Sequence, residues 1–217
     1  MPVSYGIEHT YENLQSLIPS KAEMSTAGLV LTLPSDYAGA LPLNDVADVN
    51  PTDLSFYNAL PAGGAAQLEI EGLNDQIPSR SAQLVVTFVK EGASADPVTR
   101  IQETIANLKG DSVLKTGMHA LTRAPQKIGK TPRLVAVPGY TSQAASGGGA
   151  IAFLDGPNSN RQGGIDWRET LPSSERMVPI ETGAYIQDAD GNEILRPMSG
   201  RGVVMQIRDV EEKGGYR

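Results

Sequence analysis

Four short apolar runs, each bounded by turn residues, dominate the hydrophobic pattern of the chain. They are Thr26–Pro34, Gln83–Lys90, Leu134–Val137 and Ala150–Leu154. Short runs rich in β-branched residues that end in Pro, Gly or Asp are typical of strands buried on both faces, as in a parallel sheet. Such a sheet needs helices on both sides. We therefore predict an α/β fold (α+β overall), with Thr26–Pro34, apolar nearly throughout, as a central strand.

Two of these runs end in turn signals that a parallel sheet would bring to one edge. Pro138-Gly139 follows the third run, and Asp155-Gly156-Pro157 follows the fourth. That edge holds the active site in α/β enzymes. Asp155 has no partner acid, histidine or metal cluster nearby in the sequence, so we interpret it as a turn former.

Helical periodicity begins at Asp96-Pro97, an N-cap followed by proline at the first helical position. Val98, Ile101, Ile105 and Leu108 then define one helix face, and Gly110 ends the helix. Further elements are predicted along the rest of the chain. They are a helix over Ser112 to about Arg123 with Leu114, Met118 and Leu121 inward, a short helix at Ile165–Leu171, a strand at Met177–Ile180, a hairpin over Tyr185–Leu195 turning at Asp190-Gly191, and a last helix, Gly200–Lys213, with Val203, Val204 and Ile207 inward.

The segment from about 35 to 80 has a different pattern. Gln67–Glu71 alternates polar and apolar residues with a period of two, which predicts a strand with one wet face. We expect a small β-rich unit here. The predicted division of the chain is therefore an N-terminal arm (1–25), a strand plus a small β-rich domain (26–92) and an α/β core domain (93–217).

Composition excludes several kinds of chemistry. The 217 residues include no cysteine, which excludes disulfides, thiolate metal sites and a cysteine nucleophile. The formal charge is −7, from 25 acidic and 18 basic residues, and we find no basic patch, so nucleic-acid binding is not expected. No run approaches about 18 apolar residues, so no membrane span is expected. The N-terminus shows no signal-peptide pattern.

Candidate catalytic residues are few. The two histidines are His9, in the N-terminal arm, and His119, on a predicted helix. A hydrolase triad needs a serine and a carboxylate beside the histidine, and the chain has no G-x-S-x-G elbow, so we interpret His119 as a surface or partly packed residue. Trp167, the one tryptophan, is interpreted as an amphipathic packing residue.

Two motifs resemble ligand sites only in part. Gly147–Gly149 precedes a strand, whereas a phosphate-binding loop follows a strand and opens a helix, so a flexible connector is the better interpretation. Asp188, Asp190, Asn192 and Glu193 lack the spacing of a helical calcium loop, so a solvated hairpin tip is expected. We therefore assign no catalytic, cofactor-binding or metal-binding residue and expect no cofactor.

Taken in order, several stretches resemble the tail sheath proteins of contractile phages and phage-tail-like bacteriocins. Tyr5–Glu8 is similar to the family's N-terminal opening and is followed by Thr26–Val30 leading to Pro34. Lys130–Gln143 (KTPRLVAVPGYTSQ) resembles its K-P-R-L-L-x-x-P-G-x-x-x-Q segment, and AIAFLDGPN resembles its A-I-A-I-L-D-G-P-N. Arg196–Gly214 resembles its P-P-S-G helix, preceded by a hairpin with Asp188, Gly191 and Asn192. The order and spacing agree over nearly the whole chain.

The resemblance implies a structural protein, not an enzyme. A sheath subunit of this family forms hexameric rings stacked around a tail tube above a baseplate, and contraction drives the tube into the host envelope without nucleotide hydrolysis. The resemblance also implies a core domain of subtilisin-like topology, inter-subunit arms (here residues 2–18), a place in the virion, and assembly in the host cytoplasm. Its partners would be other sheath subunits, tube and baseplate proteins, with no nucleic acid or membrane.

Two departures from the family pattern bear on the fold. The family places a helix between the two matching strands, whereas only Ala144–Gly149 intervenes here. Either the two strands are not adjacent and parallel, or the helix is lost or replaced by the SGGG link. Family members also continue into a C-terminal domain, so the chain is expected to be a truncated subunit or a fragment.

A small α/β hydrolase or a nucleotide-binding enzyme is the alternative function.

Overall fold

The structure is a computed structural model. The residues that it describes are 26–76, 83–140, 151–157, 159–171, 177–181, 183–187 and 191–213. The predicted arm (1–25), His9, the SGGG link, Asp188 and Asp190 lie outside these residues.

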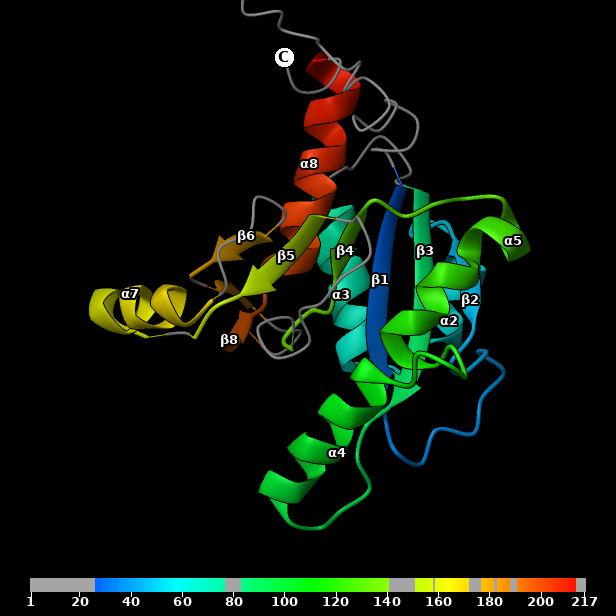
Figure 1. Ribbon diagram of the computed structural model, residues 1–217, viewed down its shortest axis with the longest axis horizontal. Helices are drawn as coiled ribbons and strands as arrows, with labels where there is room; N and C mark the ends of the chain where they lie inside the picture. Colours follow the sequence, from blue (N-terminus) through cyan, green and yellow to red (C-terminus); the bar gives the residue numbers. More distant parts are fainter. Residues whose placement is uncertain are drawn as a thin grey trace, which may run out of the picture.

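A six-stranded sheet with the order β2-β3-β1-β4-β5-β6 forms the centre of the fold (Figure 1). Its strands are β1 (Thr26–Leu33), β2 (Val46–Val49), β3 (Gln83–Lys90), β4 (Leu134–Ala136), β5 (Ile151–Asp155) and β6 (Met177–Ile180). Neighbouring strands are parallel except β2, which pairs antiparallel with β3 at one edge. β1 is buried over its whole length between β3 and β4, which confirms its predicted central place.

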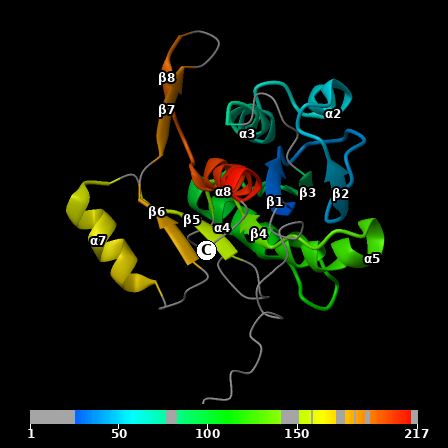
Figure 2. The same ribbon diagram turned by 90° about the horizontal axis from the view of Figure 1, so that it is seen from above.

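Helices cover both faces of this sheet, so the predicted α/β class is confirmed. Side chains alternate along a strand, and Leu29 and Leu31 of β1 therefore join one apolar cluster while Val30 joins the other. The first cluster is completed by α2 (Leu54–Ala59), α3 (Ala65–Asn74) and α8 (Ser199–Lys213), and the second by α4 (Pro97–Lys109), the 3₁₀ helix η2 (Gly117–Arg123) and α5 (Ala124–Ile128). Figure 2 shows α2 and α3 on one side of the sheet and α5 on the other. None of the described helices is both long and apolar enough to cross a bilayer.

The later elements follow the predicted order. Helix α7 (Arg161–Thr170) links β5 to β6, and the predicted hairpin is formed by β7 (Ala184–Gln187) and β8 (Glu193–Arg196). The predicted inward residues of α8, Val203, Val204 and Ile207, are all fully buried. β4 and β5 are adjacent and parallel, which excludes the first explanation of the short link between them.

The predicted strand at Gln67–Glu71 is wrong, because these residues belong to α3. The buried positions are Ala66, Glu69, Ile70 and Leu73, a helical spacing that the short polar–apolar alternation concealed. The described residues 35–76 are therefore not β-rich, since they contain one strand, β2, and two helices, α2 and α3. Strands from both sides of the predicted division at residue 92 share one sheet.

The predicted helix from Ser112 is also wrong in its first half. The Asp111 carboxylate accepts hydrogen bonds from the backbone N–H groups of Val113 and Leu114, both 2.7 Å long, in a turn that competes with a helix. The backbone is left-handed at Lys115 (φ 55°) and Gly117 (φ 56°), so the helix begins only at η2. Leu114 is consequently 72% exposed, whereas Leu121 is buried as predicted.

Helix α4 forms where predicted, but most of its apolar face is not covered. Asp96 caps it by accepting from the Thr99 N–H at 2.8 Å, and Gly110 ends it with φ 66°. Leu108 is buried, whereas Val98 is 64% and Ile101 49% exposed. Figure 1 shows the reason, since α4 extends past the end of the sheet.

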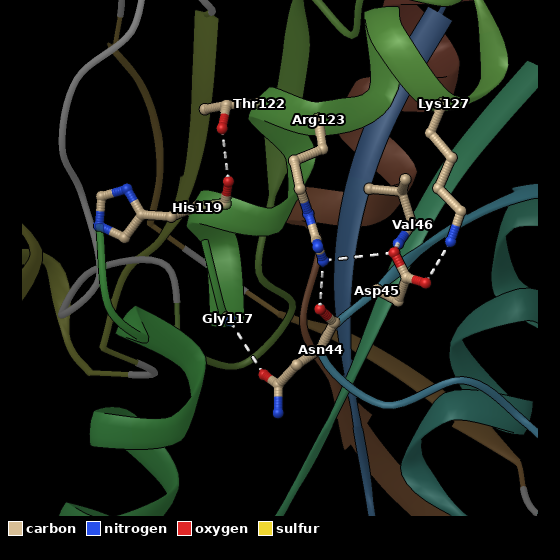
Figure 3. A network of polar contacts seen from close by, with 8 residues as sticks. All are labelled: Asn44, Asp45, Val46, Gly117, His119, Thr122, Arg123 and Lys127. Atoms are coloured by element: carbon tan, nitrogen blue, oxygen red, sulfur yellow. Dashed lines mark hydrogen bonds and ion pairs between the residues drawn. The ribbon is translucent and has the colours of Figure 1, made fainter. Parts of the chain in front are cut away.

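A polar network fixes the edge strand β2 to η2 and α5 (Figure 3). Arg123 donates to the Asn44 carbonyl at 2.7 Å and to Asp45 at 3.2 Å, and Lys127 forms an ion pair with the other oxygen of Asp45. The hydrogen bond from Lys127 and the charges of Lys127 and Arg123 lower the pKa of Asp45. These contacts hold the residues that lead into β2 against η2 and α5.

We expect Asp45→Ala to lower the free energy of unfolding by ~1 kcal/mol, because Arg123 and Lys127 lose their partly exposed carboxylate partner. The loss should shrink as salt is added, and as pH falls through the lowered pKa of Asp45. Urea unfolding at low and high salt measures it, with Asp36→Ala, which removes an exposed carboxylate, as the control. An equal effect of both substitutions would contradict a role for the network.

Candidate functional site

The candidate site lies at the sheet edge where β4 and β5 end, and the two strand ends meet there as predicted. The Asp155 carboxylate accepts a hydrogen bond from the Gly139 N–H at 3.0 Å, which joins the two strand ends. It also accepts from the Met198 and Ser199 N–H groups at 2.9 and 2.8 Å and from the Ser199 hydroxyl at 2.5 Å. Asp155 therefore does more than form a turn, because it supplies the acceptor for the first N–H groups of α8.

This contact is favourable for two reasons. The first N–H groups of a helix have no partner within the helix, and the helix dipole places partial positive charge there. A carboxylate fixed on the sheet accepts from these N–H groups and lies favourably in the field of the helix dipole. It therefore sets the position of α8 relative to β5. Both oxygens of Asp155 are occupied by these donors, so the arrangement is suited to holding a helix in place.

Behind Asp155 lies a buried group of charged side chains between α3 and α8. Glu69 of α3 and Arg201 of α8 are each only 4% exposed. Arg201 donates to the Pro197 carbonyl at 3.3 Å. Within the described part of the chain, Oε1 of Glu69 has no hydrogen-bond partner.

Burial raises the pKa of Glu69 from 4.5 to about 7. The positive charges of Arg201 and Arg196 oppose the rise, and the negative charge of Asp155 adds to it. Glu69 thus changes charge near neutral pH, inside the contact that joins the two helices.

Two glycines allow this close contact. A Cβ on Gly200 would overlap Oε1 of Glu69, and a Cβ on Gly72 would overlap the Arg201 guanidinium. Each glycine therefore leaves space for a charged side chain of the facing helix.

The remaining candidates from the sequence do not meet at this edge. His119 is half-buried on η2, and Figure 3 shows its imidazole pointing away from the polar network there. Trp167 is half-buried on α7 and lies against Gly156, in agreement with a packing role. Asn192 and Glu193 are exposed on the hairpin. Among the described residues, no group of three His, Cys, Asp or Glu could hold a metal ion.

Glu69 and Arg201 were not predicted as members of a site. Glu69 was assigned to a strand, and Arg201 carries no motif of its own. The available signals were Gly72 and Gly200, each at a helical position where glycine is unfavourable without a packing reason.

Comparisons with known proteins indicate the class of this chain. It is 27% identical over 120 residues to a prophage major tail sheath protein of Pseudomonas aeruginosa (strain UCBPP-PA14), over 51% of this chain and 31% of that protein. No protein-family model matches.

The fold is that of chains in a contractile particle. A chain of the contracted anti-feeding prophage (AFP) baseplate matches with a TM-score of 0.63 at 13% identity, over 99% of this chain and 56% of that chain. A chain of the contracted AFP helical sheath matches with a TM-score of 0.52 at 10% identity, over 98% and 54%. The chain is therefore similar in sequence to a tail sheath protein and shares its fold with the AFP chains, and it spans about a third of the curated relative and about half of each solved chain.

We expect Asp155→Ala to lower the free energy of unfolding by about 2–4 kcal/mol, because α8 loses the acceptor for its first N–H groups. Asp155→Asn, which keeps one carbonyl oxygen, should cost less. Urea unfolding followed by circular dichroism measures both. A loss for Asp155→Ala no larger than that for Asp36→Ala would contradict the capping role.

Glu69 makes stability depend on pH. Its folded pKa, about 7, lies above its ordinary value of 4.5, so the stability from the protonated form is fully present below about 4.5 and is lost as pH rises through about 7. From about pH 5 to about pH 8, the free energy of unfolding should fall by up to about 3 kcal/mol. Glu69→Gln should remove most of this fall, whereas Glu169→Gln, on the exposed side of α7, should leave it unchanged. A wild-type profile that is flat across this range would contradict the assignment.

Proposed function

We propose that this chain is a structural subunit of a contractile tail sheath. The observation that carries the proposal is the similarity to a prophage major tail sheath protein over half of the chain, joined to a fold shared with contracted AFP chains over nearly all of it. The named relatives are structural proteins, and the polar residues at the sheet edge fit this role, since Asp155 positions a helix.

In this role the chain assembles with further copies in hexameric rings around a tail tube, above a baseplate. Residues 2–18 form an arm that pairs with a neighbouring subunit. The two-layered cover of the sheet gives a stiff unit that rotates as a body when the sheath shortens. The protein is then part of the virion and is assembled in the host cytoplasm, and its net charge of −7 agrees with the absence of a nucleic-acid partner.

No observation favours the alternative of a small α/β hydrolase or a nucleotide-binding enzyme. The described residues include no serine, histidine and carboxylate arranged as a catalytic triad. The Asp155 carboxylate already accepts hydrogen bonds from backbone N–H groups.

The proposal is tested by expressing the tagged chain together with the other proteins of its tail and labelling the particles with gold-coupled antibody. We expect label along the sheath of extended particles, and label that stays on the sheath when it shortens. A chain lacking residues 2–18 should label at least about tenfold more weakly, since each lost strand pairing removes several main-chain hydrogen bonds.

Particles without label would contradict the sheath role. Reaction of the purified chain with a fluorophosphonate, or a rise in melting temperature with nucleotides, would support the enzyme instead. Full labelling by the chain that lacks residues 2–18 would contradict the proposed role of these residues as an arm, but not the sheath role.

A further inference from the structure

Helix α4 carries an apolar stripe that the rest of the described chain leaves open. Val98, Ile101, Ile105 and Lys109 lie at spacings of three, four and four, so they share one side of the helix. Val98 is 64% and Ile101 49% exposed, Ile105 is half-buried, and Lys109 is exposed at the end of the stripe. The stripe is thus apolar along most of its length with one positive charge at its C-terminal end.

The hairpin carries a second exposed surface of a different shape. Tyr185 pairs across the ribbon with Leu195, and Gln187 pairs with Glu193, so the four side chains share one face. Tyr185 is 65% and Leu195 39% exposed, whereas the opposite face, with Ile186 and Ile194, is half-buried. A two-stranded ribbon alone is only marginally stable in water, and an exposed aromatic–aliphatic pair on it is typical of a contact surface.

The two surfaces agree in spacing and in charge. Along the hairpin, the Tyr185–Leu195 pair is separated from the Gln187–Glu193 pair by about 6–7 Å. Along α4, Ile105 is separated from Lys109 by about 6 Å. If the Tyr185–Leu195 pair of one copy lay over Ile101 and Ile105 of another, these two spacings would bring the Glu193 carboxylate close to the Lys109 ammonium.

We propose that the hairpin of one copy of this chain binds the α4 stripe of the next copy. In Figure 2 the hairpin projects away from α4, so a single chain does not bring the two surfaces together. Contact between two different surfaces of identical chains is heterologous, and it continues from copy to copy as a ring or a helix. This inference rests on the proposed function, because a sheath requires such a repeated contact, and it assigns the surfaces that make it.

The test uses the absence of cysteine from the chain, so that introduced thiols report only their own positions. Ile101→Cys and Tyr185→Cys are prepared as separate variants, mixed at assembly in the particles described above, and treated with a short bismaleimide. We expect a cross-linked pair at a yield about tenfold above that of Arg100→Cys mixed with Tyr185→Cys, because Arg100 is exposed on another side of α4.

Charge exchange gives a second measurement that does not need a cross-linker. Lys109→Glu alone and Glu193→Lys alone should each weaken association of the purified chain several-fold in sedimentation velocity, and the doubly exchanged chain should recover it. Tyr185→Ala should weaken it about tenfold, as for an aromatic side chain at the centre of an interface.

Three results would overturn the contact. They are equal cross-linking through Arg100→Cys, a cross-linked pair from Ile101→Cys alone, which indicates a symmetric contact, and a doubly exchanged chain that associates more weakly than either single variant. Labelled particles that show no Ile101–Tyr185 cross-link would overturn this inference and leave the sheath role standing. Particles without the chain would overturn both.

Discussion

The structure depends on one carboxylate at the end of β5. Asp155 lies where two parallel strands finish, and it accepts the first N–H groups of α8 together with the N–H of Gly139. Helix α8 in turn buries Val203, Val204 and Ile207 against the sheet. The apolar face of α8 gives the energy of this contact, but apolar burial alone has no direction. The hydrogen bonds to Asp155 fix the position of α8 relative to the sheet.

The contact between α3 and α8 shows what this positioning costs. It places Glu69 in the interior with one unpartnered oxygen, and a Cβ at Gly200 or Gly72 would overlap the charged side chain of the facing helix. A buried carboxyl without a full set of partners destabilises a core, and the charges of Arg201 and Arg196 offset part of that cost. The edge that holds the active site in many α/β enzymes is here a structural joint between strand ends and two helices.

The sequence predicted most of the fold because its strongest signals come from buried strands. Continuous apolar runs such as Thr26–Pro34 are short and bounded by turn residues, which favours a strand over a helix. The α/β class, the central strand and the last helix are confirmed. Short patterns were less reliable. Five alternating residues at Gln67–Glu71 fit a strand and a helix equally, and the packing of Ala66, Ile70 and Leu73 on the sheet decided for the helix. The exposed face of α4 follows from where the sheet ends, which no local pattern contains.

The sequence predicted that two strand ends meet at one edge, but it assigned no site there. Turn signals at the ends of β4 and β5 indicated the edge, but most donors to Asp155, and the Arg201 charge beside Glu69, come from the start of α8, which lies far along the chain. Tertiary structure alone brings these residues together. The subtilisin-like topology and the boundaries of the three parts stay predictions.

The route of the backbone out of the hairpin has a mechanical consequence. β8 ends at Arg196, and Pro197 and Met198 lead directly into α8, whose first amides bond to Asp155. Tension applied to the hairpin therefore reaches the sheet through several hydrogen bonds that converge on one carboxylate. Such bonds resist as a group and must break together, whereas a strand peeled from an edge gives way one bond at a time.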